Sequence, residues 1–149
     1  MKLVDANLLL YAVDETSQHH VRAKEWLDKA LSGNETVLLP WVSLLAFLRI
    51  STHSRVFAHP LSIETAGAVV DAWLSQPQAI VPEPDSGHAR RIRELLVPLS
   101  QGGNLVNDAH LAALALQYDA EVVTFDNDFD RFAGVRWQMP GADAERPGR

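Results

Sequence analysis

The feature that most constrains the fold is an alternation of short apolar segments with longer amphipathic ones. Three apolar segments have the length of buried strands: residues 3–4, 36–39 and 121–125. Between and around them, apolar residues recur at helical spacing, which predicts helices at 19–31, 41–52, 62–75, 85–97 and 107–118. Buried strands that alternate with helices are typical of a parallel sheet covered on both faces. We therefore expect an α/β fold of three layers around a central, mostly parallel sheet.

The boundaries of this unit follow from its length and its ends. A chain of 149 residues has the usual size of one domain, and we expect a single domain over residues 1–140. The Pro-rich stretch 77–84 separates two helices, and a last short strand is expected at 135–137. Residues 141–149 consist mainly of Gly, Pro, Ala and charged residues, and we expect a flexible C-terminal tail there.

Composition excludes several classes of protein. The chain has no cysteine, so disulfides, thiolate zinc sites and cysteine nucleophiles are excluded. The formal net charge is -6, so any contact with RNA must use a local basic patch or a metal ion rather than bulk charge. No apolar run approaches the roughly 20 residues of a membrane span, and Asp5 interrupts the place of a signal peptide. We expect a cytoplasmic protein without membrane contact.

Aspartates fall where a site forms in such a fold. Asp5 follows the first strand, Asp126 and Asp128 follow the strand at 121–125, and Asp108 begins the helix before it. Ligands of open α/β sheets bind outside the carboxyl ends of the strands, so these side chains are expected to converge. Clustered carboxylates repel one another unless a cation neutralises them, and carboxylate oxygens suit Mg²⁺ or Mn²⁺.

Each aspartate also has a purely structural interpretation. Asp5 is compatible with a turn after a strand, and Asp126 to Asp128 with a polar turn. Asp108 is compatible with a first-turn carboxylate that the helix dipole favours. The joint pattern, rather than any single residue, favours a site.

Other residues are weighed in the same way. Three are candidates for supporting roles: Asn7 and Thr124, which lie near the carboxylates in the sequence, and Arg49, which is a candidate contact for RNA phosphate. For the remaining polar and aromatic residues we favour structural roles. These are a surface position for His110, a solvated basic face for Arg90, Arg91 and Arg93, and core positions for Trp26, Trp41, Trp73 and Trp137.

Several segments together resemble a known family. The opening strand (MKLVDANLL, 1–9) and two later segments (NDAHLA, 107–112, and VVTFDNDF, 122–129) resemble PIN-domain nucleases. Two more segments resemble VapC-type toxins of mycobacterial kind: residues 41–57, with Phe-Leu-Arg at 47–49, and residues 129–137. The resemblance covers roughly residues 1–140 and implies a PIN-like fold.

The resemblance also implies a function. Members are Mg²⁺- or Mn²⁺-dependent endoribonucleases, the toxins of toxin–antitoxin pairs, which form homodimers and are blocked by a small VapB-type antitoxin. Carried over to this chain, the catalytic residues are Asp5, Asp108, Asp126 and Asp128, with the metal at Asp5, Asp108 and Asp126.

One position departs from the family pattern. PIN-domain nucleases usually have a glutamate on the helix that precedes the Phe-Leu-Arg segment, whereas this chain has Ala46 and no acid from Trp41 to His53. Because alanine cannot bind a metal, a second hypothesis stays open: a PIN-like RNA- or protein-binding module with weak or no catalysis. We predict that the Ala46 methyl group faces the carboxylate crevice.

Three other carboxylate-based classes fit poorly. A response-regulator receiver needs a late lysine, but no lysine follows Lys29. A haloacid-dehalogenase-type phosphatase needs Asp-x-Asp near the N-terminus, where this chain has Asp5 and Asn7. An EF-hand loop needs glycine at its sixth position, which is Arg131 here.

Overall fold

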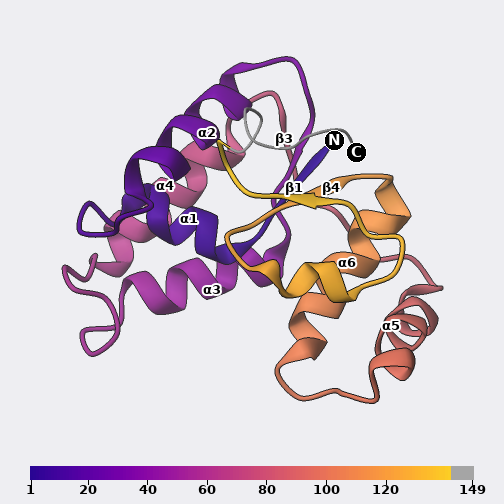
Figure 1. The fold of residues 1–149 in the computed structure, drawn as a ribbon. Helices are drawn as coiled ribbons and strands as arrows, with labels where there is room; N and C mark the ends of the chain where they lie inside the picture. Colours follow the sequence, from indigo (N-terminus) through magenta and orange to yellow (C-terminus); the bar gives the residue numbers. More distant parts are fainter. Residues whose placement is uncertain (142–149) are drawn as a thin grey trace.

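The protein forms a five-stranded parallel sheet, seen in a computed structural model that describes residues 1–141. The strand order is β3-β2-β1-β4-β5, and each neighbouring pair is parallel (Figure 1). The strands are β1 (Lys2–Val4), β2 (Val37–Leu38), β3 (Ala79–Ile80), β4 (Glu121–Val123) and β5 (Trp137–Gln138). The predicted α/β class with a parallel sheet is therefore confirmed.

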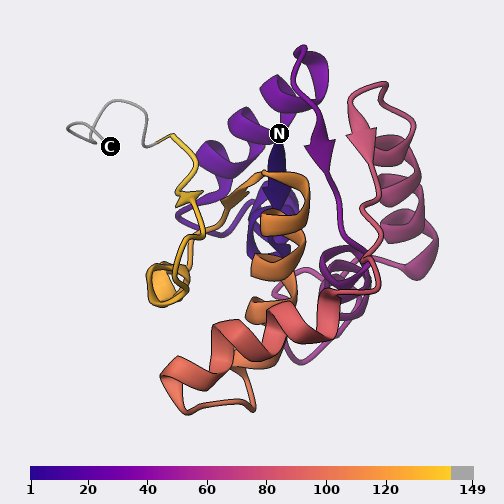
Figure 2. The ribbon, with the colours of Figure 1, turned by 90° about the vertical axis from the view of Figure 1, so that its right-hand side faces the viewer.

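Helices cover both faces of the sheet (Figures 1 and 2). The α-helices are α1 (Ala6–Val13), α2 (His20–Ser32), α3 (Trp41–Ser51), α4 (Ile63–Leu74), α5 (His88–Leu96) and α6 (Leu105–Tyr118). Two short 3-10 helices follow α5 and β4: η1 (Val97–Leu99) and η2 (Asn127–Arg131).

The strand sequences explain why there are two helical layers. Successive strand residues point to opposite faces of a sheet. Accordingly Val4 and Val123 pack in one core cluster with residues of α1 to α4, whereas Leu3 and Val122 pack in a second cluster with residues of α5 and α6. Strands that are apolar on both faces thus require helices on both sides, as the sequence predicted.

Some boundaries differ from those predicted. Helix α5 starts at His88 rather than 85, because the Asp85 carboxylate accepts the Gly87 N–H (2.9 Å) in a turn. Strand β3 lies within the Pro-rich stretch that was predicted only as a separator, where the Val37 and Leu39 N–H groups donate to the carbonyls of Gln78 and Ile80. Helix α6 starts at Leu105, and β5 at Trp137.

Two expectations concern the limits of the chain. Of the predicted tail at 141–149, only Gly141 lies within the described residues. The single domain over 1–140 stays a prediction. No helix within residues 1–141 is both long and apolar enough to cross a membrane.

Candidate active site

The candidate site lies where β1 and β4 end side by side. The two strands pair in register, with Leu3 opposite Val122 and Val4 opposite Val123. The Asp5 N–H extends this ladder with a hydrogen bond to the Val123 carbonyl (3.1 Å). Because the strands are parallel, Asp5 and the segment 124–126 emerge at the same edge of the sheet, where open α/β folds place their ligands.

The Asp5 carboxylate is held by neighbours on both strands. Its Oδ1 accepts the Ala6 N–H (2.7 Å), which caps the start of α1. Its Oδ2 accepts the Thr124 hydroxyl (2.8 Å) and, at a longer distance, the Asn7 amide (3.4 Å). A carboxylate with three donors is fixed in orientation before any ligand arrives.

Thr124 and Asn7 tie the two strand ends together. The buried Thr124 Oγ1 accepts hydrogen bonds from Asn7 Nδ2 and from the Asp126 N–H, both at 3.0 Å. The Asn7 Oδ1 accepts the Phe125 N–H (3.1 Å). The two residues that the sequence offered as supporting residues therefore contact Asp5 directly, and the geometry suits them to orient it.

Three carboxylates from two separate parts of the chain form a compact group. Oxygen atoms of Asp108, Asp126 and Asp128 all lie within 4.8 Å of one another. Asp108 comes from the first turn of α6, and Asp126 caps η2 by accepting the Asp128 N–H (2.9 Å). Oxygen ligands at this separation suit a hard divalent cation.

Asp5 is close enough to this group for its charge to act on Asp108. Burial, and then the charges of Asp5, Asp126 and Asp128, raise the pKa of Asp108 from 3.8 to about 7. Burial also raises the pKa of Asp5, against the hydrogen bonds from Thr124 and Ala6, and the Asp126 charge adds to the rise. Like charges and desolvation both disfavour the ionised carboxylates, and a bound cation would reverse this effect.

A hollow of about 120 Å³ lies beside Asp5 and Asp108. Its other lining residues come from α1, α3 and α6: Ala6, Val42, Ser43, Ala46, Asn107 and Leu111. Ala46 thus borders the same hollow as the two carboxylates, so the space where a longer side chain would reach them is open. The sequence reasoning missed Ser43, whose buried hydroxyl donates to the Val4 carbonyl (2.7 Å) and fixes α3 against β1.

Other sequence-based interpretations fare differently. Arg49 is exposed on α3 and does not line the hollow, so its predicted contact with phosphate stays a prediction. Trp41 is 47% exposed at the start of α3, so its predicted core position is wrong. The other three tryptophans do pack against or within the two core clusters.

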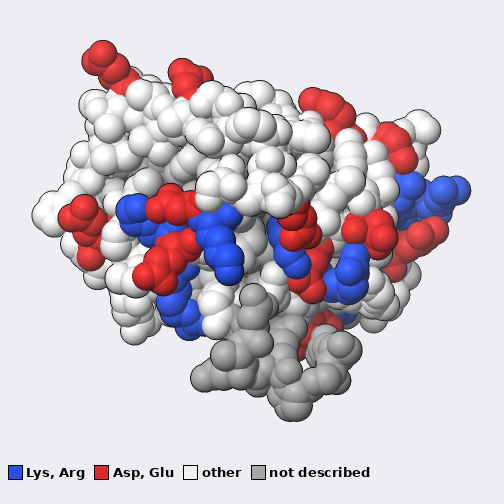
Figure 3. All heavy atoms as spheres, turned by 90° about the horizontal axis from the view of Figure 1, so that it is seen from above, with Lys and Arg blue, Asp and Glu red and all other residues white. Residues whose placement is uncertain are grey.

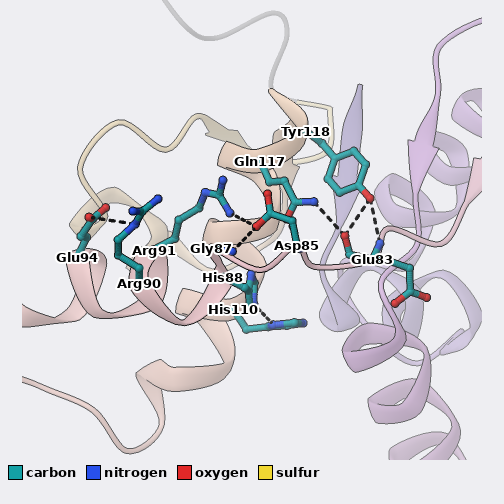
Figure 4. Close-up of polar contacts among 10 residues, drawn as sticks. All are labelled: Glu83, Asp85, Gly87, His88, Arg90, Arg91, Glu94, His110, Gln117 and Tyr118. Atoms are coloured by element: carbon teal, nitrogen blue, oxygen red, sulfur yellow. Dashed lines mark hydrogen bonds and ion pairs between the residues drawn. The ribbon is translucent and has the colours of Figure 1, made fainter.

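The predicted surface position of His110 is wrong as well. His110 is half-buried, and its Nδ1 lies 2.7 Å from Nε2 of His88 on α5, as Figure 4 shows. Burial lowers the pKa of both imidazoles, which keeps them neutral near pH 7. His110 thus connects α5 and α6 through its contact with His88. This pairing argues against a role for His110 as a base beside Asp108.

The formal net charge of -6 offers no bulk attraction for a polyanion. On α5, Arg91 forms an ion pair with Asp85, and Arg90 lies 3.9 Å from Glu94 (Figure 4). On the face drawn in Figure 3, basic side chains alternate with acidic ones, and no broad basic patch gathers there. Recognition of a polyanion would then depend on the neutralised carboxylate site and on local contacts.

Comparisons with known proteins agree with the fold. Residues 2–135 match the family described as PIN domain. The chain is 50% identical to Ribonuclease VapC37 of Mycobacterium tuberculosis, over 95% of this chain and 99% of that protein. It is 39% identical to Ribonuclease VapC33 of the same species, over 94% and 98% of the two chains.

Solved structures share the architecture at low sequence identity. VapC20 of M. tuberculosis, described as a sarcin-ricin loop cleaving toxin, matches with a TM-score of 0.66 and 19% identity, over 91% of this chain and 99% of that one. VapBC2 from Rickettsia felis, bound to a DNA fragment from its promoter, matches with a TM-score of 0.65 and 20% identity, over 93% and 97%.

Proposed function

The chain belongs to the PIN-domain family, and because its relatives include VapC ribonucleases over nearly its whole length, we propose that it is a metal-dependent endoribonuclease, the toxin of a toxin–antitoxin pair. It hydrolyses RNA phosphodiester bonds. The observation that carries this proposal is the group of Asp108, Asp126 and Asp128 oxygens within 4.8 Å at the carboxyl edge of the sheet, with Asp5 beside it.

The residues at this edge fit a hard divalent cation, Mg²⁺ or Mn²⁺. Their donors are carboxylate oxygens, and burial together with mutual repulsion holds the pKa of Asp108 far above its usual range. Asp5, Asp108 and Asp126 would hold the ion, with Asp128 close enough to assist as a fourth catalytic carboxylate. Mg²⁺ usually keeps several waters, so a missing carboxylate at position 46 is compatible with binding.

A cation bound there supplies Lewis-acid stabilisation of the phosphate charge. The chain's own part is positioning. Thr124 and Asn7 hold Asp5 in one orientation, and Asp126 is tied to the same network through its N–H. Fixed groups of this kind lower the barrier because they need little rearrangement during the reaction.

Ala46 favours a second candidate function. The hollow beside Asp5 and Asp108 is bordered by a methyl group where a further ligand would fit. A chain with weakened metal binding would act as a PIN-like module that binds RNA or protein without cutting it.

Two partners besides RNA belong to the proposal: a VapB-type antitoxin and a second copy of the chain. The observation that supports both partners is a set of exposed apolar side chains. Trp41 and Leu45 are 47% and 57% exposed one turn apart on α3, and Ile63 is 68% exposed at the start of α4. A contiguous exposed pair such as Trp41 and Leu45 is a candidate for contact with a partner.

The test is a cleavage assay on structured RNAs. We expect cleavage in Mn²⁺ or Mg²⁺ that EDTA abolishes and that is lost in Asp126→Asn. Asp71→Asn, an exposed carboxylate on α4, serves as the matched control and should cleave normally. RNA binding with no cleavage in any divalent cation would reject the nuclease and leave the binding module.

A further inference from the structure

Three aromatic rings form a cluster directly beside the candidate site. Phe125 lies between Thr124 and Asp126, and its ring centroid is 4.6 Å from that of His19 and 5.2 Å from that of Tyr11. The Tyr11 and His19 rings are 5.0 Å apart, so all three contact one another. The cluster joins the last turn of α1, the residue before α2 and the segment after β4.

The cluster and the carboxylates share one network. The Phe125 N–H donates to Asn7 Oδ1 (3.1 Å), and Asn7 in turn donates to Thr124 and Asp5. Tyr11 lies four residues after Asn7 on α1, and residues at this spacing share a helix face. A ligand held at the carboxylates therefore has the aromatic cluster about one helical turn away.

The rings differ from those of the interior. Phe47 and Phe129 are fully buried, whereas Tyr11, His19 and Phe125 are each half-buried and keep surface open to solvent. Tyr11 and Phe125 pack partly against the core on the α1–α4 side. Filling the core thus accounts for only part of each ring.

The side chain of Arg22 lies next to the cluster. The Arg22 guanidinium carbon lies 6.0 Å from the Phe125 ring centroid. Its Nε and Nη2 donate to the Pro140 carbonyl at 3.1 and 2.6 Å, which holds the guanidinium in place while its charge remains. Aromatic faces next to an arginine are a combination that proteins use to bind unstacked bases.

We infer that the cluster of Tyr11, His19 and Phe125 receives one unstacked base of a single-stranded RNA, adjacent to the phosphate at the carboxylates; this rests on the proposed ribonuclease function. Stacking is the interaction that suits this acidic chain, because it needs no bulk positive charge. Arg22 adds a positive charge beside the ring for the backbone of that nucleotide.

The test compares His19→Ala and Phe125→Leu with the control His59→Ala, an exposed histidine outside the cluster. His19 precedes α2 without a side-chain capping hydrogen bond, so its removal leaves the helix start intact even if Phe125→Leu folds poorly. One base–aromatic stack corresponds to about fivefold or more in affinity. We therefore expect kcat/KM to fall by that factor in the two cluster variants only. The fall should come from a higher KM, with kcat unchanged.

Two further readouts use the RNA itself. An abasic nucleotide next to the cleaved phosphate should cost the wild type the same factor, and should cost His19→Ala nothing further. When the RNA carries 2-aminopurine at that position and binds in Ca²⁺, the wild type should quench its fluorescence. The cluster variants should quench it less.

The outcomes separate this inference from the proposed function. A wild type that quenches 2-aminopurine but cleaves no RNA in Mn²⁺ contradicts the nuclease while supporting the stacking site. A wild type that cleaves, with His19→Ala unchanged in both KM and quenching, overturns the stacking site alone. Equal losses in His59→Ala would overturn it too.

Discussion

Replacing Asp108 by asparagine removes one of four charges at the crevice and nearly keeps the side-chain shape. The position is informative because a structural carboxylate in the first turn of α6 should stabilise that helix, whereas a crowded site carboxylate should destabilise the metal-free protein. Its environment favours the second case, since burial and three neighbouring carboxylates raise its pKa to about 7.

The magnitude follows from that pKa. Since the pKa is higher in the folded protein than its ordinary value of 3.8, folding binds more protons, and stability falls as pH rises between 3.8 and about 7. At a pH above both pKa values, this pKa difference lowers the stability of the folded protein by about 4 kcal/mol. Because Asp108 is only half-buried, solvent screening reduces this to about 2 kcal/mol.

The assay is urea unfolding of the metal-free protein at pH 4 and pH 8, with RNA cleavage in saturating Mn²⁺ measured alongside. We expect Asp108→Asn to be more stable than the wild type by about 2 kcal/mol at pH 8, nearly equal to it at pH 4, and inactive. Asp71→Asn should match the wild type in all three measurements. Full cleavage by Asp108→Asn, or equal stability at pH 8, would refute the reasoning that this carboxylate belongs to a repulsive metal site.

Three other changes test separate parts of the structure. Ala46→Glu should place a carboxylate in the hollow and strengthen Mn²⁺ binding by about tenfold in calorimetry; unchanged or weaker affinity would reject a vacated ligand position. Thr124→Val should remove one hydrogen bond each from Asp5, Asn7 and the Asp126 N–H and lower the free energy of unfolding by about 1–3 kcal/mol, so equal stability contradicts the network. Light scattering should find a dimer at micromolar concentration that Leu45→Glu dissociates, while Val21→Glu on α2 does not; a strictly monomeric wild type rejects the dimer.

The layered fold was predictable because its signals are local. Strand residues such as Leu3 and Val4 are apolar on both faces, which requires helices on both sides of the sheet. Gly and Pro mark most helix ends within a few residues. Strand β3 was missed because Ala79 and Ile80, bounded by Pro77 and Pro82, form too short an apolar run to detect by periodicity.

The aspartates were also identifiable from the sequence, because strand ends and a helix start in one α/β unit meet at one edge. Their environment was not. The bond from Thr124 to Asp5 joins residues 119 positions apart, and the contact of His110 with His88 joins two helices.

The sequence by itself thus determined the class of fold, the edge that carries the candidate site and the residue types available there. Only the tertiary structure decided that Asp128 joins Asp108 and Asp126, that Ala46 borders a hollow and that Tyr11, His19 and Phe125 come together. The physical reason is that periodicity and propensity report local backbone geometry, whereas oxygen separations, burial and ring contacts depend on packing between segments far apart in the chain.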